Sequence, residues 1–131
     1  MNEPETVAKI LAMKTIAVVG LSAKEDRPSY RVASYLKEHG YRIVPVNPMI
    51  SEWKSEKSYP DLATIPFKID VVDIFRKSED VLPIVKSAIA IGAAAVWMQE
   101  GVINDAAAQE AEKAGLLVVM DRCFMKEHAK T

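Results

Sequence analysis

The apolar residues gather in short runs, and several of these runs begin directly after a glycine. Three stretches of helical pattern end at Gly40, Gly92 and Gly115, and an apolar run follows each of them. Glycine readily adopts the left-handed conformation that ends a helix, because it has no Cβ. The repeated order of helix, glycine and strand predicts alternating β and α elements, and therefore a parallel sheet.

The runs themselves are typical of strands that are covered on both faces. Residues 15–19 and 116–119 are almost continuously apolar rather than alternating, as in parallel sheets between two layers of helices. Further strands are expected at residues 41–46, 69–75 and 93–98. Asp73 lies inside one of these runs, so a polar partner is expected for its carboxyl group.

The segments between the runs have the pattern of amphipathic helices. Val81, Ile84, Val85 and Ala88 follow the spacing of one buried helix face. Asn104 is expected to cap an alanine-rich helix that ends at Ala114. A short helix is expected at 6–13, and a longer one is expected to begin at Pro28 and Ser29.

Pro45 bears on the order of the five strands. Proline removes a backbone donor and usually places its strand at the edge of a sheet, which favours the order 2-1-3-4-5. The dinucleotide-binding order 3-2-1-4-5 is the alternative, and the pattern alone leaves both open.

Composition predicts a single domain over residues 1–131. Half of the residues are hydrophobic, 27% are charged and the formal net charge is −1, which argues against nucleic acid as a partner. Cys123 is the only cysteine, so no internal disulfide can form and a cytoplasmic location is expected. The longest apolar run, 89–98, is shorter than the ~20 residues that span a bilayer, and the acidic N-terminus lacks a signal core, so no membrane partner is expected.

Two glycines are not needed to end helices. Gly20 and Gly101 come directly after the first and the fourth strand. Ligands of open α/β sheets bind beyond the carboxyl ends of the strands, where the strand order reverses. We therefore predict a ligand cleft there rather than two ordinary turns.

The loop at 20–30 favours an anion. Ser22 stands where the dinucleotide fingerprint has its second glycine, and the helix begins only at Pro28. Free amides at a helix start bind phosphate, and hydroxyl and cationic side chains in the loop can assist. The alternative is a solvated loop whose cations pair with Glu25 and Asp26.

Other chemistries have little support. No Asp or Glu follows Val46, where an NAD site would bind the ribose. The Ser22 segment lacks the last glycine of a serine hydrolase motif. His39 and His128 lack the spacing of metal ligands, so no metal site is expected. Cys123 suits either a buried apolar residue or a reactive thiol.

Six short motifs follow one another along the chain in the order typical of one family. They are Gly20-Leu21-Ser22, Arg27-Pro28-Ser29-Tyr30, Pro45-Val46-Asn47-Pro48, Asp73-Ile74-Phe75-Arg76, Trp97-Met98-Gln99-Glu100-Gly101 and Asp121-Arg122-Cys123. They cover about residues 14–123, and the chain is similar to the small stand-alone CoA-binding proteins, relatives of the CoA-binding domain of the succinyl-CoA synthetase α subunit. The resemblance implies a Rossmann-like α/β fold, with an open parallel sheet of five strands in the order 3-2-1-4-5, helices on both faces, and coenzyme A across the strand ends.

The resemblance also implies which residues touch coenzyme A. The first loop would surround the phosphates, the residues after the second and third strands would line the nucleotide, and those after the fourth would border the pantetheine exit. These candidates are, in that order, Gly20, Leu21, Ser22, Ala23, Lys24, Arg27, Ser29 and Tyr30; Asn47, Pro48, Phe75 and Arg76; Gln99 and Gly101.

Three functions remain open from the sequence. The first is a non-catalytic module that binds coenzyme A or an acyl-CoA, since the second domain of the synthetase, with its phosphorylated histidine, has no counterpart here. The second is an NAD(P)-linked or CoA-transfer enzyme that needs a partner chain. The third is a redox role through a Cys123–CoA mixed disulfide. Met49, Ile50 and Trp53 in the irregular stretch 48–66 are expected to form a partner or dimer surface.

Overall fold

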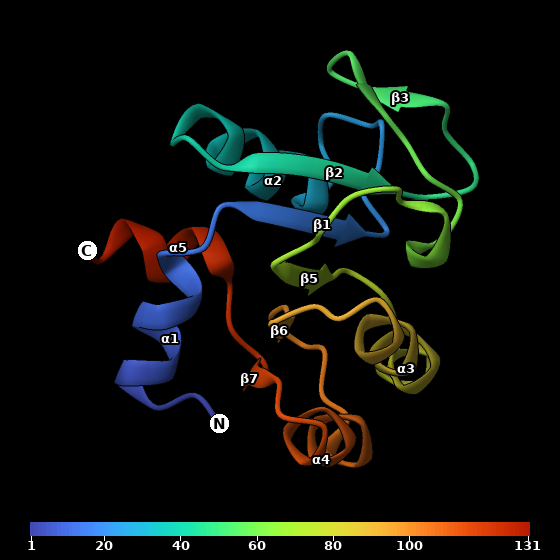
Figure 1. Cartoon of the computed structure of the whole chain (residues 1–131). Coiled ribbons are helices and arrows are strands. Elements are labelled where there is room, and N and C mark those ends of the chain that lie inside the picture. Colours follow the sequence, from blue (N-terminus) through green and yellow to red (C-terminus); the bar gives the residue numbers. More distant parts are fainter.

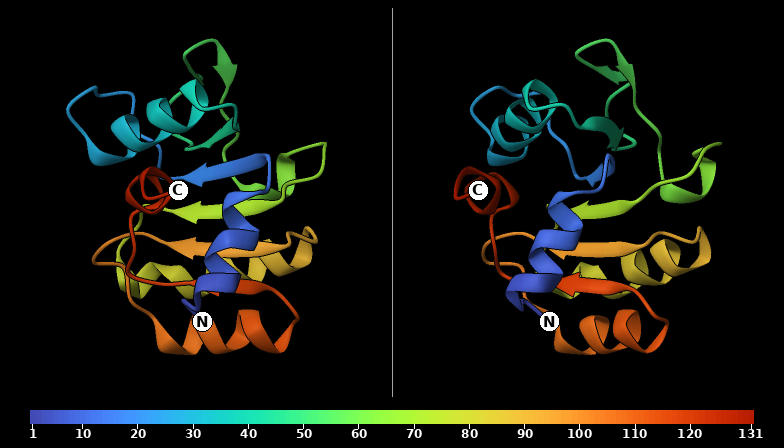
Figure 2. Two further views of the ribbon diagram at one scale, coloured as in Figure 1. Left: turned by 90° about the vertical axis from the view of Figure 1, so that its left-hand side faces the viewer. Right: turned by 60° about the vertical axis from the view of Figure 1, so that its left-hand side comes forward.

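Five strands form a parallel sheet in the computed structural model, which describes residues 1–131. Their arrows all point the same way, so the carboxyl ends meet along one edge (Figures 1 and 2). A separate pair of two-residue strands forms an antiparallel hairpin. The strands of the sheet are β1 (Thr15–Val19), β2 (Arg42–Val46), β5 (Val71–Ile74), β6 (Ala95–Met98) and β7 (Leu117–Val119), and those of the hairpin are β3 (Glu52–Trp53) and β4 (Glu56–Lys57).

Helices cover both faces of the sheet, which confirms the expected Rossmann-like α/β class. One layer is α1 (Pro4–Leu11), α2 (Pro28–Glu38) and α5 (Phe124–Ala129), and the other is α3 (Val81–Ala90) and α4 (Asp105–Lys113) (Figure 1). Successive residues of each strand enter opposite layers: in β1, Ala17 packs toward α3 and α4, and Val18 packs toward α2. Two 3₁₀ turns, η1 (Leu62–Thr64) and η2 (Ser78–Asp80), complete the elements.

The expected strand order 3-2-1-4-5 is wrong. The sheet runs β2-β1-β5-β6-β7, which is 2-1-3-4-5 when the five strands are numbered along the chain. The edge position that Pro45 favours is therefore the observed one. The physical reason is that the stretch 48–66 supplies no full strand beside β2: only Tyr59 pairs with Val46, as an isolated parallel bridge.

Both edges of the sheet are partly occupied. Beside β2, the amide N–H of Tyr59 donates to the carbonyl of Pro45 over 3.0 Å, and Asn47 N–H donates to Tyr59 over 2.9 Å. Beside β7, the Asn2 side chain accepts from Met120 N–H over 2.7 Å and donates to Met120 O over 2.8 Å. Such cover limits the pairing of edge strands with other chains.

The local signals place the helix ends within a few residues. Pro28 is the first residue of α2, and Asn104 caps α4 by accepting from Ala107 N–H over 2.9 Å. The first helix begins at Pro4 rather than Thr6, since proline is well suited to a first helical turn. No helix in the structure combines the length and apolar character needed to cross a membrane.

The hairpin β3–β4 corrects one surface expectation. Trp53 is 2% exposed, so it is a core residue rather than part of an exposed partner surface. Its ring meets Tyr30 of α2 edge to face, with the centroids 5.9 Å apart. Met49 is 86% exposed and Ile50 is partly buried. The apolar surface of this stretch is therefore smaller than the sequence suggests.

Candidate functional site

The loops after the strands are tied together at the carboxyl edge of the sheet. The β ladder continues beyond the strands: Gly20 N–H donates to Val46 O and Phe75 N–H donates to Val19 O, both over 2.9 Å. The order reverses between β1 and β5, so Gly20 and Phe75 flank the reversal. Gly101 follows β6, one strand further along, so it does not flank the reversal as the expected order implied.

Gly20 permits the closest approach in this region. Its φ is +89°, and a Cβ at this position would run into the carbonyl oxygen of Phe75 and lie 3.0 Å from Cδ of Arg76. Both the conformation and the lack of space require glycine here. Gly20 therefore allows the loops after β1 and β5 to lie against each other.

A cavity of about 750 Å³, here called the loop pocket, opens at this place. The loops after β1, β5, β6 and β7 all contribute to its wall, together with the first turns of α2. The volume falls in the range of small-molecule sites. Its lining residues are Gly20, Ser22, Arg27, Pro28, Ser29, Val32, Phe75, Arg76, Lys77, Asp80, Gln99, Glu100, Val102 and Cys123.

Hydrogen bonds hold the first loop against the start of α2. Ser22 N–H donates to Ser29 Oγ over 3.0 Å, and Lys24 N–H donates to Ser22 Oγ over 3.1 Å. Both hydroxyls accept in these bonds, so each keeps its own O–H available as a donor. The N–H groups of Ser29 and Tyr30 lie in the first turn of α2, where a helix offers no internal acceptor. The loop thus presents several donors to an anion.

The cations of the loop pocket form no ion pair with a carboxylate. Arg27, Arg76 and Lys77 line it, and none of them takes part in an ion pair. Glu100 and Asp80 also line it; Glu100 pairs with Lys126 over 3.0 Å, and Asp80 alone leaves the three cations in excess. The alternative in which the loop cations pair with Glu25 and Asp26 finds no ion pair to support it. The pocket therefore has an excess of uncompensated positive charge.

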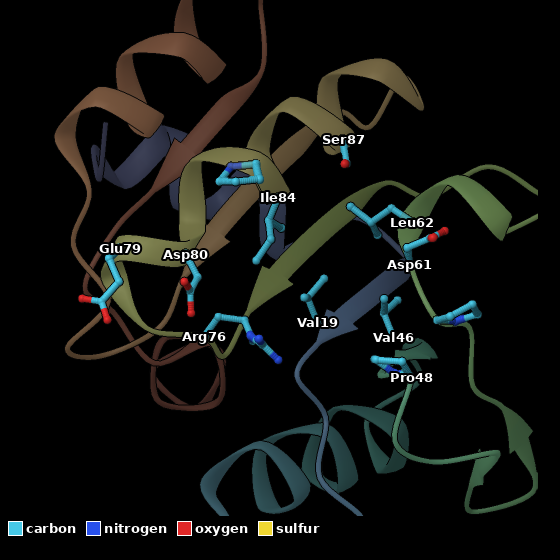
Figure 3. Close-up of a pocket in the computed structure, with 12 residues that line it drawn as sticks. Val19, Val46, Pro48, Asp61, Leu62, Arg76, Glu79, Asp80, Ile84 and Ser87 are labelled. Carbon is cyan, nitrogen blue, oxygen red and sulfur yellow. The ribbon is translucent and has the colours of Figure 1, made fainter.

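A second cavity of about 440 Å³, here called the edge pocket, shares Arg76 and Asp80 with the loop pocket. Figure 3 shows Val19, Val46, Leu62 and Ile84 facing its interior, with Arg76 at one end. This wall is mostly apolar and comes from β1, β2, η1 and α3. Its other lining residues are Pro48, Pro60, Asp61, Glu79, Pro83 and Ser87.

Asp73 lies beneath the site with no contact to solvent. Gln99 Nε2 donates to Asp73 Oδ1 over 2.7 Å, which supplies the expected polar partner, and Asp73 Oδ2 has none. Burial raises the pKa of Asp73 from 3.8 to about 7, and the bond from Gln99 opposes this rise. The carboxyl group is therefore held near the point of half protonation at neutral pH.

Cys123 is buried and lines the loop pocket at the residue before α5. Trp97 Nε1 donates to the neighbouring carbonyl of Arg122 over 2.8 Å, and this bond fixes the backbone before Cys123. The cysteine is thus both a core residue and a wall of the cavity, as each of the two sequence interpretations requires. No three His, Cys, Asp or Glu side chains are grouped so that they could hold a metal ion.

The structure brings many of the residues implied by the family resemblance to the two pockets. Gly20, Ser22, Arg27, Ser29, Phe75, Arg76 and Gln99 line the loop pocket, and Pro48 and Arg76 line the edge pocket.

The other implied residues line neither pocket. Leu21 is fully buried in the core, and Ala23 and Lys24 are exposed on the loop. Tyr30 packs against Trp53. Asn47 donates to Leu21 O over 3.0 Å and accepts from Met49 N–H over 2.9 Å, so its amide joins the loops after β1 and β2. Gly101 N–H donates to Asp121 Oδ1 over 2.7 Å.

Sequence reasoning missed Lys77 and most of the edge pocket, of which only Pro48 and Arg76 are among the implied residues. Lys77 adjoins Arg76 directly after β5, so the cationic pair at a strand end could have been noticed. The edge pocket left no such signal, because η1 and α3 contribute residues that are distant in sequence.

Comparisons with known proteins agree on one family. The family described as CoA binding domain matches residues 14–129. YneT, an uncharacterised protein of Bacillus subtilis strain 168, is 39% identical over 118 residues, which cover 90% of this chain and 87% of YneT. A hypothetical protein from Pyrococcus horikoshii OT3, whose structure has been solved, is 43% identical, with a TM-score of 0.92 over 96% of this chain and 89% of that chain.

A third relative is a much longer protein. An ADP-forming acetate–CoA ligase of Archaeoglobus fulgidus is 33% identical over 63 residues. The match covers 47% of this chain and only 9% of the ligase. It relates a small part of that protein to this chain.

Gly20→Ala is expected to destabilise the protein more than Gly40→Ala. The two glycines have φ values of +89° and +92°, but nothing lies within 4 Å of a Cβ at Gly40. The left-handed strain alone costs ~1–2 kcal/mol, and the collision with Phe75 O adds to it only at Gly20. Urea denaturation of both variants measures the difference, and equal losses would contradict the close approach.

Asp73→Asn is expected to change how stability depends on pH. The folded protein binds the Asp73 proton more tightly than the unfolded chain does. Protonated Asp73 therefore adds to the free energy of unfolding below pH 3.8, and this contribution is lost as the pH rises to about 7. The slope is ~1.4 kcal/mol per pH unit. In denaturant titrations, the free energy of unfolding of the variant minus that of wild type should therefore rise by about 2–3 kcal/mol between pH 5 and pH 8. A difference that does not vary with pH would contradict this.

Proposed function

Because the chain belongs to the CoA-binding domain family, we propose that it binds coenzyme A or an acyl-CoA at the two pockets and catalyses no reaction on its own. The observation that carries this proposal is the set of unpaired cations, Arg27, Arg76 and Lys77, in a cavity that also contains the start of α2. Coenzyme A bears a pyrophosphate and a 3′-phosphate, and these groups need several amides and cations. A neutral or acidic pocket would lack the charge-assisted contacts that bind these phosphates.

The two pockets differ in a way that suits the parts of this ligand. In our proposal the phosphates lie in the loop pocket, near Arg27 and Ser29. The flat adenine ring occupies the apolar edge pocket beyond Arg76, between Val46 and Ile84. The pantetheine arm extends in the opposite direction, past Gln99 and Cys123. Arg76 borders both pockets and is the candidate to bind a phosphate between them.

An enzyme that needs a partner chain is the first alternative. The acetate–CoA ligase relative contains a segment like this one in a far longer protein, so a catalytic partner would supply the remaining parts. The NAD(P)-linked version of this alternative is less favoured. The loop after β2 carries Asn47 instead of a carboxylate, and its amide is engaged by Leu21 and Met49.

The cytoplasmic location and the relation to the succinyl-CoA synthetase α subunit stay predictions. Both rest on the sequence. They concern the setting of the protein, and ligand binding can be tested without them.

Coenzyme A is expected to raise the melting temperature of the protein. A ligand at a hundred times its Kd stabilises by about 2.7 kcal/mol. Arg27→Ala should raise the Kd for coenzyme A by about tenfold or more, since it removes a charge-assisted contact. Arg31→Ala is the matched control, because Arg31 is an exposed arginine four residues further along, in the first turn of α2, and lines neither pocket.

Thermal-shift titrations with coenzyme A, acetyl-CoA, dephospho-CoA, NAD and NADP measure these effects. A shift with NAD and none with coenzyme A would overturn the proposed function. An equal loss for Arg27→Ala and Arg31→Ala would mean that general charge, and not the loop pocket, binds the ligand.

The position of Cys123 in the loop pocket favours a second candidate function, which is thiol exchange with oxidised coenzyme A. The Cys123 thiolate would attack one sulfur of CoA disulfide, forming a Cys123–CoA mixed disulfide and releasing the other CoA as its thiolate. Intact-mass measurement after incubation with CoA disulfide should show a CoA adduct that dithiothreitol removes. Cys123→Ser should show none, and an unmodified wild-type protein would exclude this function.

A further inference from the structure

The wall of the loop pocket contains one polar group whose orientation is set by the core. Gln99 comes directly after β6 and is 4% exposed. Its Nε2 donates to Asp73 Oδ1 over 2.7 Å, and Asp73 is fully buried. Asp73 makes no other side-chain hydrogen bond, since Oδ2 has no partner. The single polar contact of this buried carboxyl group is therefore the amide that lines the cavity.

The chemistry of the pair fixes the direction of the amide. Gln99 turns its NH₂ group toward Asp73, and Asp73 Oδ1 accepts from it both when the carboxyl group is ionised and when Oδ2 carries the proton. The Oε1 atom of the same planar amide then points away from Asp73. It makes no hydrogen bond in the chain, and the fully buried side-chain atoms without a partner belong to Ser34, Trp53 and Asp73. Gln99 Oε1 is therefore accessible from the loop pocket.

This acceptor lies on a different side of the pocket from the main anion site. Arg27 and Ser29 lie at the start of α2, which follows β1, whereas Gln99 follows β6, two strands away from β1 in the sheet. A free carbonyl oxygen backed by a buried carboxyl group repels phosphate, which also only accepts. The two sides of the pocket thus suit different chemical groups.

We propose that Asp73 is a positioning residue: it holds Gln99 Oε1 toward the loop pocket, where this atom accepts a hydrogen bond from an N–H or S–H group on the uncharged arm of the ligand. The inference rests on the proposed function, because it assigns the thiol-bearing arm to the Gln99 side and the phosphates to the Arg27 side. Amides and a thiol are the donors that such an arm carries. The pair thereby fixes which way round the ligand lies.

The test compares coenzyme A with adenosine 3′,5′-bisphosphate, which has phosphates but no arm. Isothermal titration of Gln99→Met and Asp73→Leu should give a three- to tenfold weaker Kd for coenzyme A, about the effect of one net hydrogen bond. The Kd for the bisphosphate should stay within about twofold of wild type. Gln109→Met is the matched control on the exposed face of α4 and should leave both constants unchanged.

A reversed pair supplies the rescue. Gln99→Glu alone places two carboxyl groups side by side and should weaken the binding of coenzyme A. Adding Asp73→Asn restores a donor opposite an acceptor, because the new asparagine amide can donate to one carboxylate oxygen and leave the other facing the pocket. The double variant should recover most of the lost affinity for coenzyme A.

The outcomes separate this inference from the proposed function. A wild-type protein that binds neither ligand would overturn both. Normal binding of coenzyme A by wild type together with equal losses for the two ligands in Gln99→Met and Asp73→Leu would overturn the inference alone, since damage to the fold does not depend on the arm. Unchanged coenzyme A binding in both variants, or no recovery in the double variant, would also overturn it.

Discussion

The contact between Gly20 and the carbonyl of Phe75 is the constraint on which the site depends. Parallel strands bring their carboxyl ends to one edge, but side chains normally keep neighbouring loops apart. At Gly20 the missing Cβ lets the loop after β1 pass directly over the backbone after β5. Arg76 consequently lies at the junction of the loop pocket and the edge pocket, where it borders both. A larger residue at position 20 would therefore push apart the loops after β1 and β5, next to which Arg76 borders both pockets.

Charge and burial divide the site into regions of different character. The cations of the loop pocket lie at the exposed rim and are free of carboxylate partners, so a polyanion can bind them without displacing an internal ion pair. Asp73 lies beneath the floor, where desolvation raises its pKa and Gln99 is its only polar partner. Asp73 and Gln99 bring no positive charge to the floor, so the cations stay confined to the rim of the cavity. The rim and the floor therefore differ in charge, so the cavity is electrostatically asymmetric.

Features with a local cause could be read from the sequence, and features made by distant segments could not. Pro28 and Asn104 act on the backbone next to them, and the ends of α2 and α4 were predicted from them. Pro45 also indicated the edge strand correctly, whereas the order implied by the resemblance did not hold, because only Tyr59 of the stretch 48–66 pairs with β2. The burial of Trp53 depends on Tyr30 and α2, which no pattern within 48–66 could reveal. In the site, loop residues near Gly20 were foreseen, while the edge pocket required the folded positions of η1 and α3.

The cover over the two outer strands has a consequence for self-association. Asn2 satisfies both the amide and the carbonyl of Met120 beyond β7, and Tyr59 bonds to the backbone beside β2. A second copy that paired with the sheet at these places would have to displace those residues and leave their polar groups without partners. Self-association by backbone pairing is therefore disfavoured at the two places that Asn2 and Tyr59 cover.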